Sequence, residues 1–121
     1  MAVILIIDDS PTELHLFQGM LEKGGFETLV VDSGEEGIRQ AGAVRPDCIL
    51  MDVVMPGMNG FQATRKLTKD PHTSDIPVIM ITSKDQETDK IWGMRQGAVE
   101  YIVKPVGQEE LVSKINSVMA G

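Results

Sequence analysis

Short apolar runs rich in β-branched residues recur along the chain, and each has the length of a buried strand. They cover residues 3–7, 28–31, 48–51, 78–81 and 101–103. The longer amphipathic stretches between them predict helices at about residues 11–23, 34–43, 59–68, 86–96 and 108–119. Strands that alternate with helices through short connections predict an α/β fold of five βα units. We expect a doubly wound parallel sheet with helices on both faces.

Two serines mark the starts of predicted helices. Ser10-Pro11-Thr12-Glu13 has the pattern of a capping box with proline at the first helical position. Ser33-Gly34-Glu35-Glu36 repeats the pattern before the second helix. We therefore expect reciprocal serine–glutamate hydrogen bonds at both helix starts.

The composition limits the classes of function. The 121 residues, 42% of them hydrophobic, have the size of one domain, so we expect one domain over residues 1–121 and no output domain. Asp and Glu outnumber Lys and Arg by 18 to 11, which argues against direct nucleic-acid binding.

No run has the length of a membrane span, and the start lacks the features of a signal peptide. We expect a cytoplasmic protein in which Cys48, the single cysteine, is a buried structural thiol.

Polar residues follow four of the predicted strands at their carboxyl ends, where open α/β sheets place their functional crevice. They are Asp8 and Asp9, Asp52, Thr82 with Ser83, and Lys104. Three carboxylates at one sheet edge repel one another unless a cation offsets their charge. Mg²⁺ fits best, because it prefers oxygen ligands and binds through one or two carboxylates together with a phosphate. The lysine and the threonine hydroxyl can then hold phosphoryl oxygens.

Each of these residues also has a simpler explanation. Asp8 and Asp9 could cap a helix or solvate a loop, and Asp52 could be a turn residue. Lys104 could be an exposed loop lysine, and Thr82 could be a helix N-cap. Their joint placement at successive strand ends favours a functional site over these separate explanations.

Four motifs make the sequence resemble the receiver domain of two-component response regulators over its whole length. The resemblance is to the chemotaxis regulator and other single-domain members. It implies a flavodoxin-like three-layer sandwich with strand order 2-1-3-4-5. The motifs are Ile6-Ile7-Asp8-Asp9-Ser10, Leu50-Met51-Asp52-Val53-Val54-Met55-Pro56-Gly57-Met58-Asn59-Gly60, Pro77-Val78-Ile79-Met80-Ile81-Thr82-Ser83 and Tyr101-Ile102-Val103-Lys104-Pro105.

This resemblance implies roles for the strand-end carboxylates. Asp52 is the phosphorylated residue. Mg²⁺ is bound by Asp9, Asp52 and the backbone carbonyl of Val54, while Asp8 acts through metal-bound water. Phosphoryl transfer would then depend on positioning and charge neutralisation, and the domain would catalyse its own phosphorylation and dephosphorylation without being an enzyme that acts on other substrates.

The resemblance also assigns the remaining site residues. Lys104 pairs with the phosphoryl group, Thr82 is the switch hydroxyl, and Tyr101 is the switch aromatic. A cis peptide bond is implied between Lys104 and Pro105. Output passes through the fourth helix, fifth strand and fifth helix, where Lys90, Trp92 and Tyr101 form the expected partner face. Trp92 could equally pack partly into the core.

A narrower resemblance is carried by residues 59–65 and 82–90, which are similar to single-domain regulators of type IV pilus twitching motility. It implies a histidine kinase as phosphodonor and a downstream motility protein as partner. We expect a monomer or weak dimer.

Two positions depart from the chemotaxis pattern. Val54, two residues after Asp52, offers no side-chain hydrogen bond to an attacking water, and Lys84, two after Thr82, replaces an acidic residue. We hypothesise a longer-lived aspartyl phosphate than in fast-hydrolysing relatives.

The sequence is compatible with alternative functions. The protein could be a phosphate sink that competes for a shared kinase. A small aspartyl-phosphate phosphatase is a further alternative, although Val54 stands where a second acid–base carboxylate is needed. A flavin carrier is disfavoured because Asp8 and Asp9 would repel a cofactor phosphate.

Overall fold

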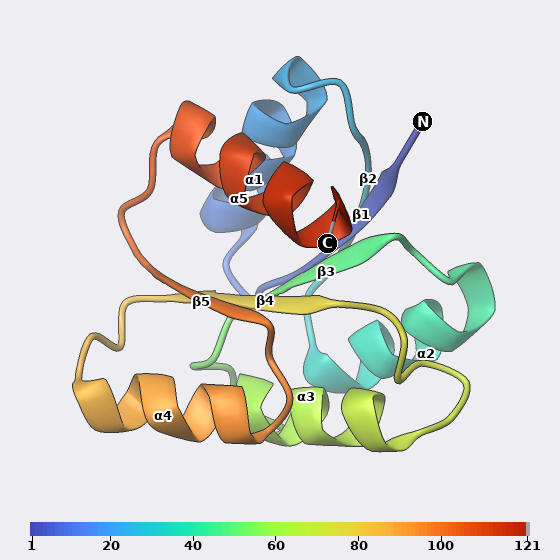
Figure 1. Ribbon diagram of the computed structural model, residues 1–121, viewed down its shortest axis with the longest axis vertical. Helices are drawn as coiled ribbons and strands as arrows, with labels where there is room; N and C mark the ends of the chain where they lie inside the picture. Colours follow the sequence, from blue (N-terminus) through green and yellow to red (C-terminus); the bar gives the residue numbers. More distant parts are fainter. Residues whose placement is uncertain (121) are drawn as a thin grey trace.

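The computed structural model describes residues 1–120 and contains, in that range, five strands and five helices in strict alternation (Figure 1). The strands are β1 (Val3–Ile7), β2 (Glu27–Val31), β3 (Cys48–Met51), β4 (Val78–Thr82) and β5 (Glu100–Val103). The helices are α1 (Pro11–Lys23), α2 (Gly34–Val44), α3 (Gly60–Lys69), α4 (Glu87–Arg95) and α5 (Gln108–Ala120). None of these helices is both long enough and apolar enough to cross a bilayer.

The strands form one parallel sheet in the order β2-β1-β3-β4-β5, which confirms the fold class and strand order implied by the sequence. The pairing of β1 with β3 places Ile7 beside Met51. Residues that directly follow these two strands therefore meet at one edge of the sheet. The carboxyl end of β3 lies in the middle of that edge, between β1 and β4.

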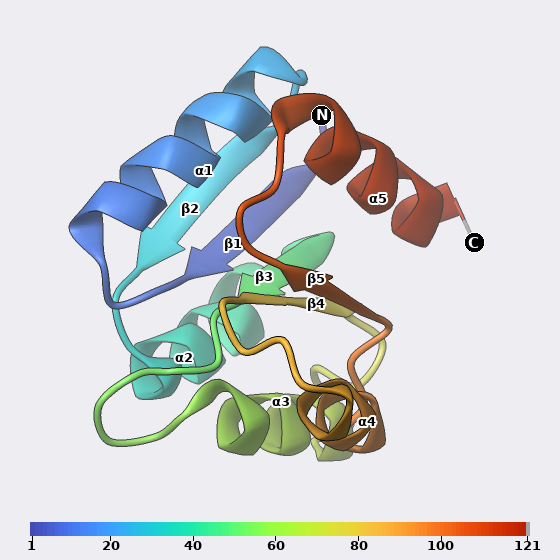
Figure 2. The ribbon, with the colours of Figure 1, turned by 90° about the vertical axis from the view of Figure 1, so that its left-hand side faces the viewer.

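The helices cover both faces of the sheet, as the alternating pattern predicts. Helices α1 and α5 lie on one face, and α2, α3 and α4 lie on the other (Figures 1 and 2). Alternate residues of β1 face the two layers. Ile4 and Ile6 pack with the α1 and α5 side chains, whereas Leu5 and Ile7 pack with those of α2 and α3.

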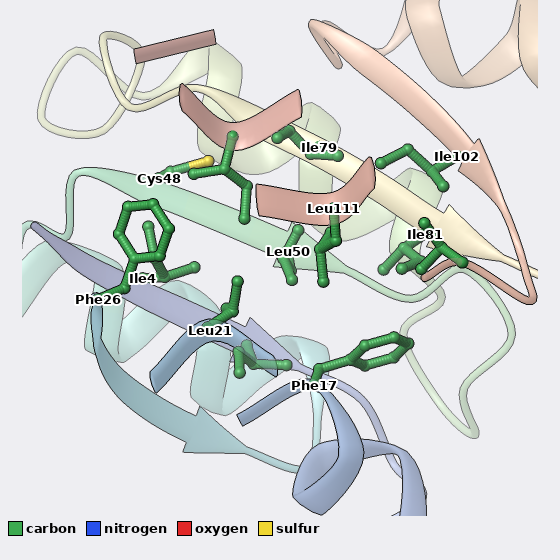
Figure 3. Packing of buried hydrophobic residues seen from close by; sticks show 13 residues of the cluster. Ile4, Phe17, Leu21, Phe26, Cys48, Leu50, Ile79, Ile81, Ile102 and Leu111 are labelled. Carbon is green, nitrogen blue, oxygen red and sulfur yellow. The ribbon is translucent and has the colours of Figure 1, made fainter. Parts of the chain in front are cut away.

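Burial of apolar side chains holds the layers together. Figure 3 shows the cluster on the α1 and α5 face, where Phe17 and Leu21 of α1 and Leu111 of α5 contact the strands. Cys48 is fully buried in this cluster, as predicted, and burial raises the pKa of its thiol to about 12. A thiol with this pKa stays protonated, so it is a structural group.

The helix starts agree only in part with the predicted capping boxes. Ser10 and Ser33 are the N-caps, and each hydroxyl accepts a hydrogen bond from the backbone N–H three residues later. The glutamate side chains do not complete the boxes, however, because they bind cations instead. Glu13 reaches the ammonium of Lys104 at 3.5 Å, and Glu36 pairs with Arg39. The prediction of reciprocal boxes is wrong because a nearby cation offers each carboxylate a charged partner.

Candidate functional site

Three carboxylates meet at the carboxyl edge of the sheet. Asp8 and Asp9 follow β1 and Asp52 follows β3, and the three side chains place one oxygen each within 4.8 Å of the others. Asp8 and Asp52 are buried, whereas Asp9 is exposed. The backbone N–H of Asp52 donates to the carbonyl of Ile7 at 2.9 Å, so the pairing of β1 with β3 fixes the arrangement. The sequence-predicted convergence of these carboxylates is therefore present in the structure.

Lys104 enters the same cluster from the end of β5. Its Nζ lies 3.2 Å from Oδ2 of Asp8 and 3.7 Å from Oδ1 of Asp52, and its side chain is mostly buried. The alternative of an exposed loop lysine is therefore wrong. Burial alone would lower the pKa of Lys104, but the charges of Asp52 and Asp8 outweigh it, so the pKa is raised and the ammonium stays charged. The following peptide bond, to Pro105, is cis.

The surroundings of Asp52 shift the pKa of its carboxylate. Burial, the largest cause, and the negative charge of Asp8 raise the pKa of Asp52 to about 6, although the charge of Lys104 partly opposes them. Oδ1 of Asp52 accepts the backbone N–H of Val53 at 2.8 Å, which holds the side chain at the strand end. Asp52 is thus ionised at neutral pH, although burial and the charge of Asp8 make its ionised form unfavourable. A bound cation would stabilise that ionised form.

Two residues of α1 belong to the site although sequence reasoning gave them no role in it. Glu13 lies 3.5 Å from Nζ of Lys104, and the ring of Phe17 lies under the same ammonium, with the ring centre 5.5 Å away. Both positions are on the helix that starts directly after Asp9. Their spacing of four residues places them on one helical face, which is the signal in the sequence that could have identified them.

Thr82, at the end of β4, is completely buried, and its hydroxyl accepts the backbone N–H of Lys84 at 3.3 Å. Helix α4 begins later, with Gln86 as its N-cap, so the N-cap alternative for Thr82 is wrong. The backbone N–H of Lys104 donates to the carbonyl of Thr82 at 2.8 Å, which ties the ends of β4 and β5 together. Thr82 and Lys104 are therefore neighbours at the same edge as Asp52.

Tyr101 corrects one part of the predicted partner face. Its side chain is only 7% exposed and packs beneath α4, where Gly93 leaves room for the ring. The hydroxyl donates to the backbone carbonyl of Lys84 at 2.8 Å. The expectation that Tyr101 presents surface to a partner is wrong for this conformation, because the ring turns inward and its hydroxyl is already bonded.

Helix α4 exposes the other members of that face. Trp92 is 50% exposed and Lys90 is exposed, whereas Gly93 is the buried residue of the helix. Ile91 and Met94 are also exposed beside Trp92. Trp92 belongs to none of the core clusters described above and keeps half of its surface in solvent, whereas the glycine of α4 faces the sheet.

The two positions that depart from the chemotaxis pattern both border the site. Val54 lies in the loop after Asp52 and is 59% exposed. Lys84 is partly exposed, and its Nζ lies 3.7 Å from Oδ1 of Asp89 in the first turn of α4. Neither side chain adds a carboxylate or an amide to the cluster.

The donor set fits a hard divalent cation. Asp8, Asp9 and Asp52 supply only carboxylate oxygens, two of the three residues are buried, and one lysine cannot neutralise three negative charges. Oxygen ligands with an excess of negative charge are what Mg²⁺ requires. Asp9 is exposed, so the cluster is accessible to solvent on its side.

A parallel sheet of order 2-1-3-4-5 whose carboxyl edge gathers three aspartates and a lysine has the architecture of the receiver class of signalling domains. A family model described as the response regulator receiver domain matches residues 4–116, and the chain belongs to this family.

Relatives of known sequence agree with this assignment. Protein PilH of Pseudomonas aeruginosa is 59% identical over 121 residues, and the match covers 100% of both chains. This match confirms the narrower resemblance to regulators of type IV pilus twitching motility. The phosphate regulon transcriptional regulatory protein PhoB of the same organism is 40% identical over 96% of this chain, which spans 51% of PhoB.

Solved structures agree as well. The chemotaxis protein CheY4 of Vibrio cholerae superposes with a TM-score of 0.91 at 30% identity, over 98% of each chain. The receiver domain of the sensor histidine kinase PA1611 of Pseudomonas aeruginosa has a TM-score of 0.92 at 27% identity, covering 99% of this chain and 98% of that one. That structure holds a magnesium ion in its active-site cleft.

Proposed function

We propose that this receiver accepts a phosphoryl group on Asp52 from a histidine kinase, in a Mg²⁺-dependent reaction, and signals through protein contacts. The observation that carries the proposal is the acidic cluster with the ammonium of Lys104 lying 3.2 Å from Asp8 and 3.7 Å from Asp52. Buried like charges of this kind are costly to a fold, and a role in binding a cation and a phosphoryl group accounts for them.

In the proposed step, a carboxylate oxygen of Asp52 attacks the phosphorus of a phosphohistidine on the kinase. The new O–P bond forms as the N–P bond breaks, and the electron pair of that bond stays on the imidazole nitrogen. Asp52 must be ionised to attack, which its pKa of about 6 allows at neutral pH. The hydrogen bond from the backbone N–H of Val53 to Oδ1 keeps the carboxylate aimed from the strand end.

Lys104 and Thr82 would stabilise the transferred group. The ammonium of Lys104 is charged and already within 4 Å of Asp52, so it can follow the charge that develops on the phosphoryl oxygens. The Thr82 hydroxyl lies at the neighbouring strand end and can turn toward the same oxygens. The backbone of Lys84 connects the two residues, because its N–H donates to the Thr82 hydroxyl and its carbonyl accepts the Tyr101 hydroxyl. A shift of Thr82 would therefore reach Tyr101 through Lys84, which makes Tyr101 the proposed second switch residue.

Asp9, Asp52 and the backbone carbonyl of Val54 would hold Mg²⁺ directly, and Asp8 would act through water. When bound, the ion supplies positive charge against the three carboxylates and the phosphoryl oxygens. Asp8 already accepts the backbone N–H of Ser10 at 2.9 Å and the ammonium of Lys104. These two bonds occupy both of its carboxylate oxygens, which supports an indirect role for this residue.

The proposed output surface is the exposed face of α4, β5 and α5. Trp92, Ile91 and Met94 form an apolar group on α4, with Lys90 beside them. Exposed large apolar side chains with a central tryptophan are typical of protein-binding surfaces. The resemblance to twitching-motility regulators and the full-length match to PilH support a partner in a type IV pilus or chemotaxis-like motility pathway.

The test is phosphotransfer from purified histidine kinases carrying labelled phosphate, with Mg²⁺ or with a chelator. We expect label on the wild-type chain only with Mg²⁺, and none on Asp52→Asn. Asp85→Asn, an exposed aspartate outside the cluster, is the matched control and should be labelled like the wild type. Label on Asp52→Asn at the wild-type level would overturn the proposal.

A further inference from the structure

A groove of about 880 Å³ runs between α2 and α3, on the face of the sheet opposite to α1 and α5. Its apolar part comes from Ile38 of α2 and Met58 of the loop before α3, which are both half-buried against the core. Figure 2 shows the two helices side by side on that face. The groove belongs to neither the acidic cluster nor the exposed face of α4.

One wall of the groove is strongly basic. Arg65, Lys66 and Lys69 of α3 line it, and all three are exposed. Among residues 1–120, no carboxylate lies within ion-pair distance of any of the three. These charges lie together in a chain of net charge -7, so the groove differs in sign from the protein as a whole.

The remaining polar residues of the groove are already engaged. Oε1 of Gln62 accepts the backbone N–H of Asn59 at 2.9 Å, as part of the cap of α3. Asp70 is the one carboxylate of the lining, and its Oδ1 accepts the backbone N–H of His72 at 2.9 Å. The basic wall therefore carries a net positive charge that the groove itself does not neutralise.

An apolar floor beside unpaired cations is complementary to a segment that carries both apolar and acidic side chains. The lining has no aromatic ring on which a nucleic-acid base could stack, and its apolar side chains, Ile38 and Met58, have no counterpart in a phosphate backbone. We propose that the groove between α2 and α3 docks an acidic amphipathic segment of a partner protein, with an apolar side chain over Ile38 and Met58 and carboxylates facing Arg65, Lys66 and Lys69.

The groove can be tested by backbone amide NMR on the full chain. The probe is a synthetic amphipathic peptide of Glu, Ala and Leu, and its counterpart with Lys in place of Glu is the control ligand. We expect shift changes confined to α2, α3 and residues 57–58 with the acidic peptide and none with the basic one. Shift changes that map to α4, or spread evenly over the surface, would contradict the proposal.

Two triple variants distinguish binding in the groove from a general effect of net charge on peptide binding. Arg65→Glu with Lys66→Glu and Lys69→Glu removes the basic wall. The matched control, Lys23→Glu with Lys90→Glu and Arg95→Glu, changes the net charge equally at exposed cations that also lack ion pairs within residues 1–120. We expect the first variant to bind the acidic peptide at least about tenfold more weakly than the control variant.

Two outcomes would overturn the docking proposal. Equal loss in both triple variants would mean that net charge, and not the groove, drives binding. Vesicles of anionic phospholipid that produce the same shift changes in α2 and α3 would assign the groove to a membrane surface instead. Four of the replaced cations lie in the last turns of their helices, where a carboxylate opposes the helix dipole: Lys23, Lys66, Lys69 and Arg95. We therefore expect both variants to unfold a few degrees below the wild type and by similar amounts, which circular dichroism checks.

Discussion

Gly60 packs its Cα directly against the backbone of Asp52. A Cβ atom added to Gly60 would collide with the carbonyl oxygen of Asp52 and lie 2.8 Å from the Cα of Val53. The N–H of Gly60 also donates to the carbonyl of Val53 at 2.8 Å. The first residue of α3 is therefore part of the support for the candidate phosphoacceptor.

We expect Gly60→Ala to lower the free energy of unfolding by about 2 kcal/mol, because the backbone around Asp52 must move to admit a methyl group. Gly19→Ala in α1 is the matched control, since nothing lies within 4 Å of its added Cβ. It should raise stability by up to about 1 kcal/mol through helix propensity. Urea unfolding measures both, and a Gly60→Ala variant as stable as the wild type would show that the contact is loose.

Asp52 should make the metal-free protein less stable as pH rises. Its pKa is raised from 3.8 to about 6 by burial and by Asp8, so between these values the native state binds more protons than the unfolded state. The stability associated with protonated Asp52 is complete below about pH 4 and lost above about pH 6. Asp52→Asn removes this loss and should be more stable than the wild type by about 3 kcal/mol at pH 7.

The measurement is urea unfolding in a chelator across that pH range. The difference between Asp52→Asn and the wild type should shrink toward zero near pH 4. Glu110→Gln is the control, because it removes one negative charge at an exposed position of α5, away from the cluster. A constant difference at every pH would contradict the raised pKa of Asp52.

Lys104→Gln should slow phosphorylation of Asp52 by about 100-fold, because the ammonium is the cation nearest to the accepting carboxylate. Lys114→Gln is the matched control, since its ammonium lies 3.7 Å from Glu100, on β5, and is partly exposed. Rates from a small phosphodonor with Mg²⁺ measure the effect without a kinase interface. Equal rates for the two variants would remove Lys104 from the proposed mechanism.

The exposed Val54 and the partly exposed Lys84 are expected to lengthen the life of the phosphorylated form. Val54→Asn with Lys84→Glu would supply an amide and a carboxylate near the phosphoryl group and should speed dephosphorylation by about tenfold. Val44→Asn with Lys23→Glu makes the same chemical changes at exposed positions of other elements. The measurement is the rate at which labelled phosphate leaves the protein in Mg²⁺. If Val54→Asn with Lys84→Glu loses its label at the wild-type rate, the hypothesis of a longer-lived aspartyl phosphate is wrong.

Much of the site could be predicted because its residues lie directly after strands. Once β1 and β3 are adjacent, Asp8, Asp9 and Asp52 must meet, and the apolar runs alone locate both strand ends. Contacts made by helices were harder to predict. The Ser10–Glu13 spacing is satisfied equally by a capping box or by a glutamate that turns to Lys104, and only the packed structure brings that lysine near.

The position of Tyr101 was not predictable from strand periodicity. In β5 both Tyr101 and Ile102 are buried, one under α4 and the other among the α1 and α5 side chains. The ring fits beneath α4 because Gly93 has no side chain there, and Trp92, the preceding residue of the helix, is half exposed. The glycine inside the helix was thus the signal in the sequence for the buried ring, but it is informative only when the residues that pack against it are known.

The strand order described above has a consequence for the integrity of the protein. Asp8 and Asp9 come from the first strand, Asp52 from the third and Lys104 from the loop after the last, so the site draws on nearly the full length of the chain. No proteolytic fragment that lacks either β1 or the end of β5 can assemble the cluster. A single cut that releases either end would therefore silence the receiver completely, rather than leave a partly active remnant.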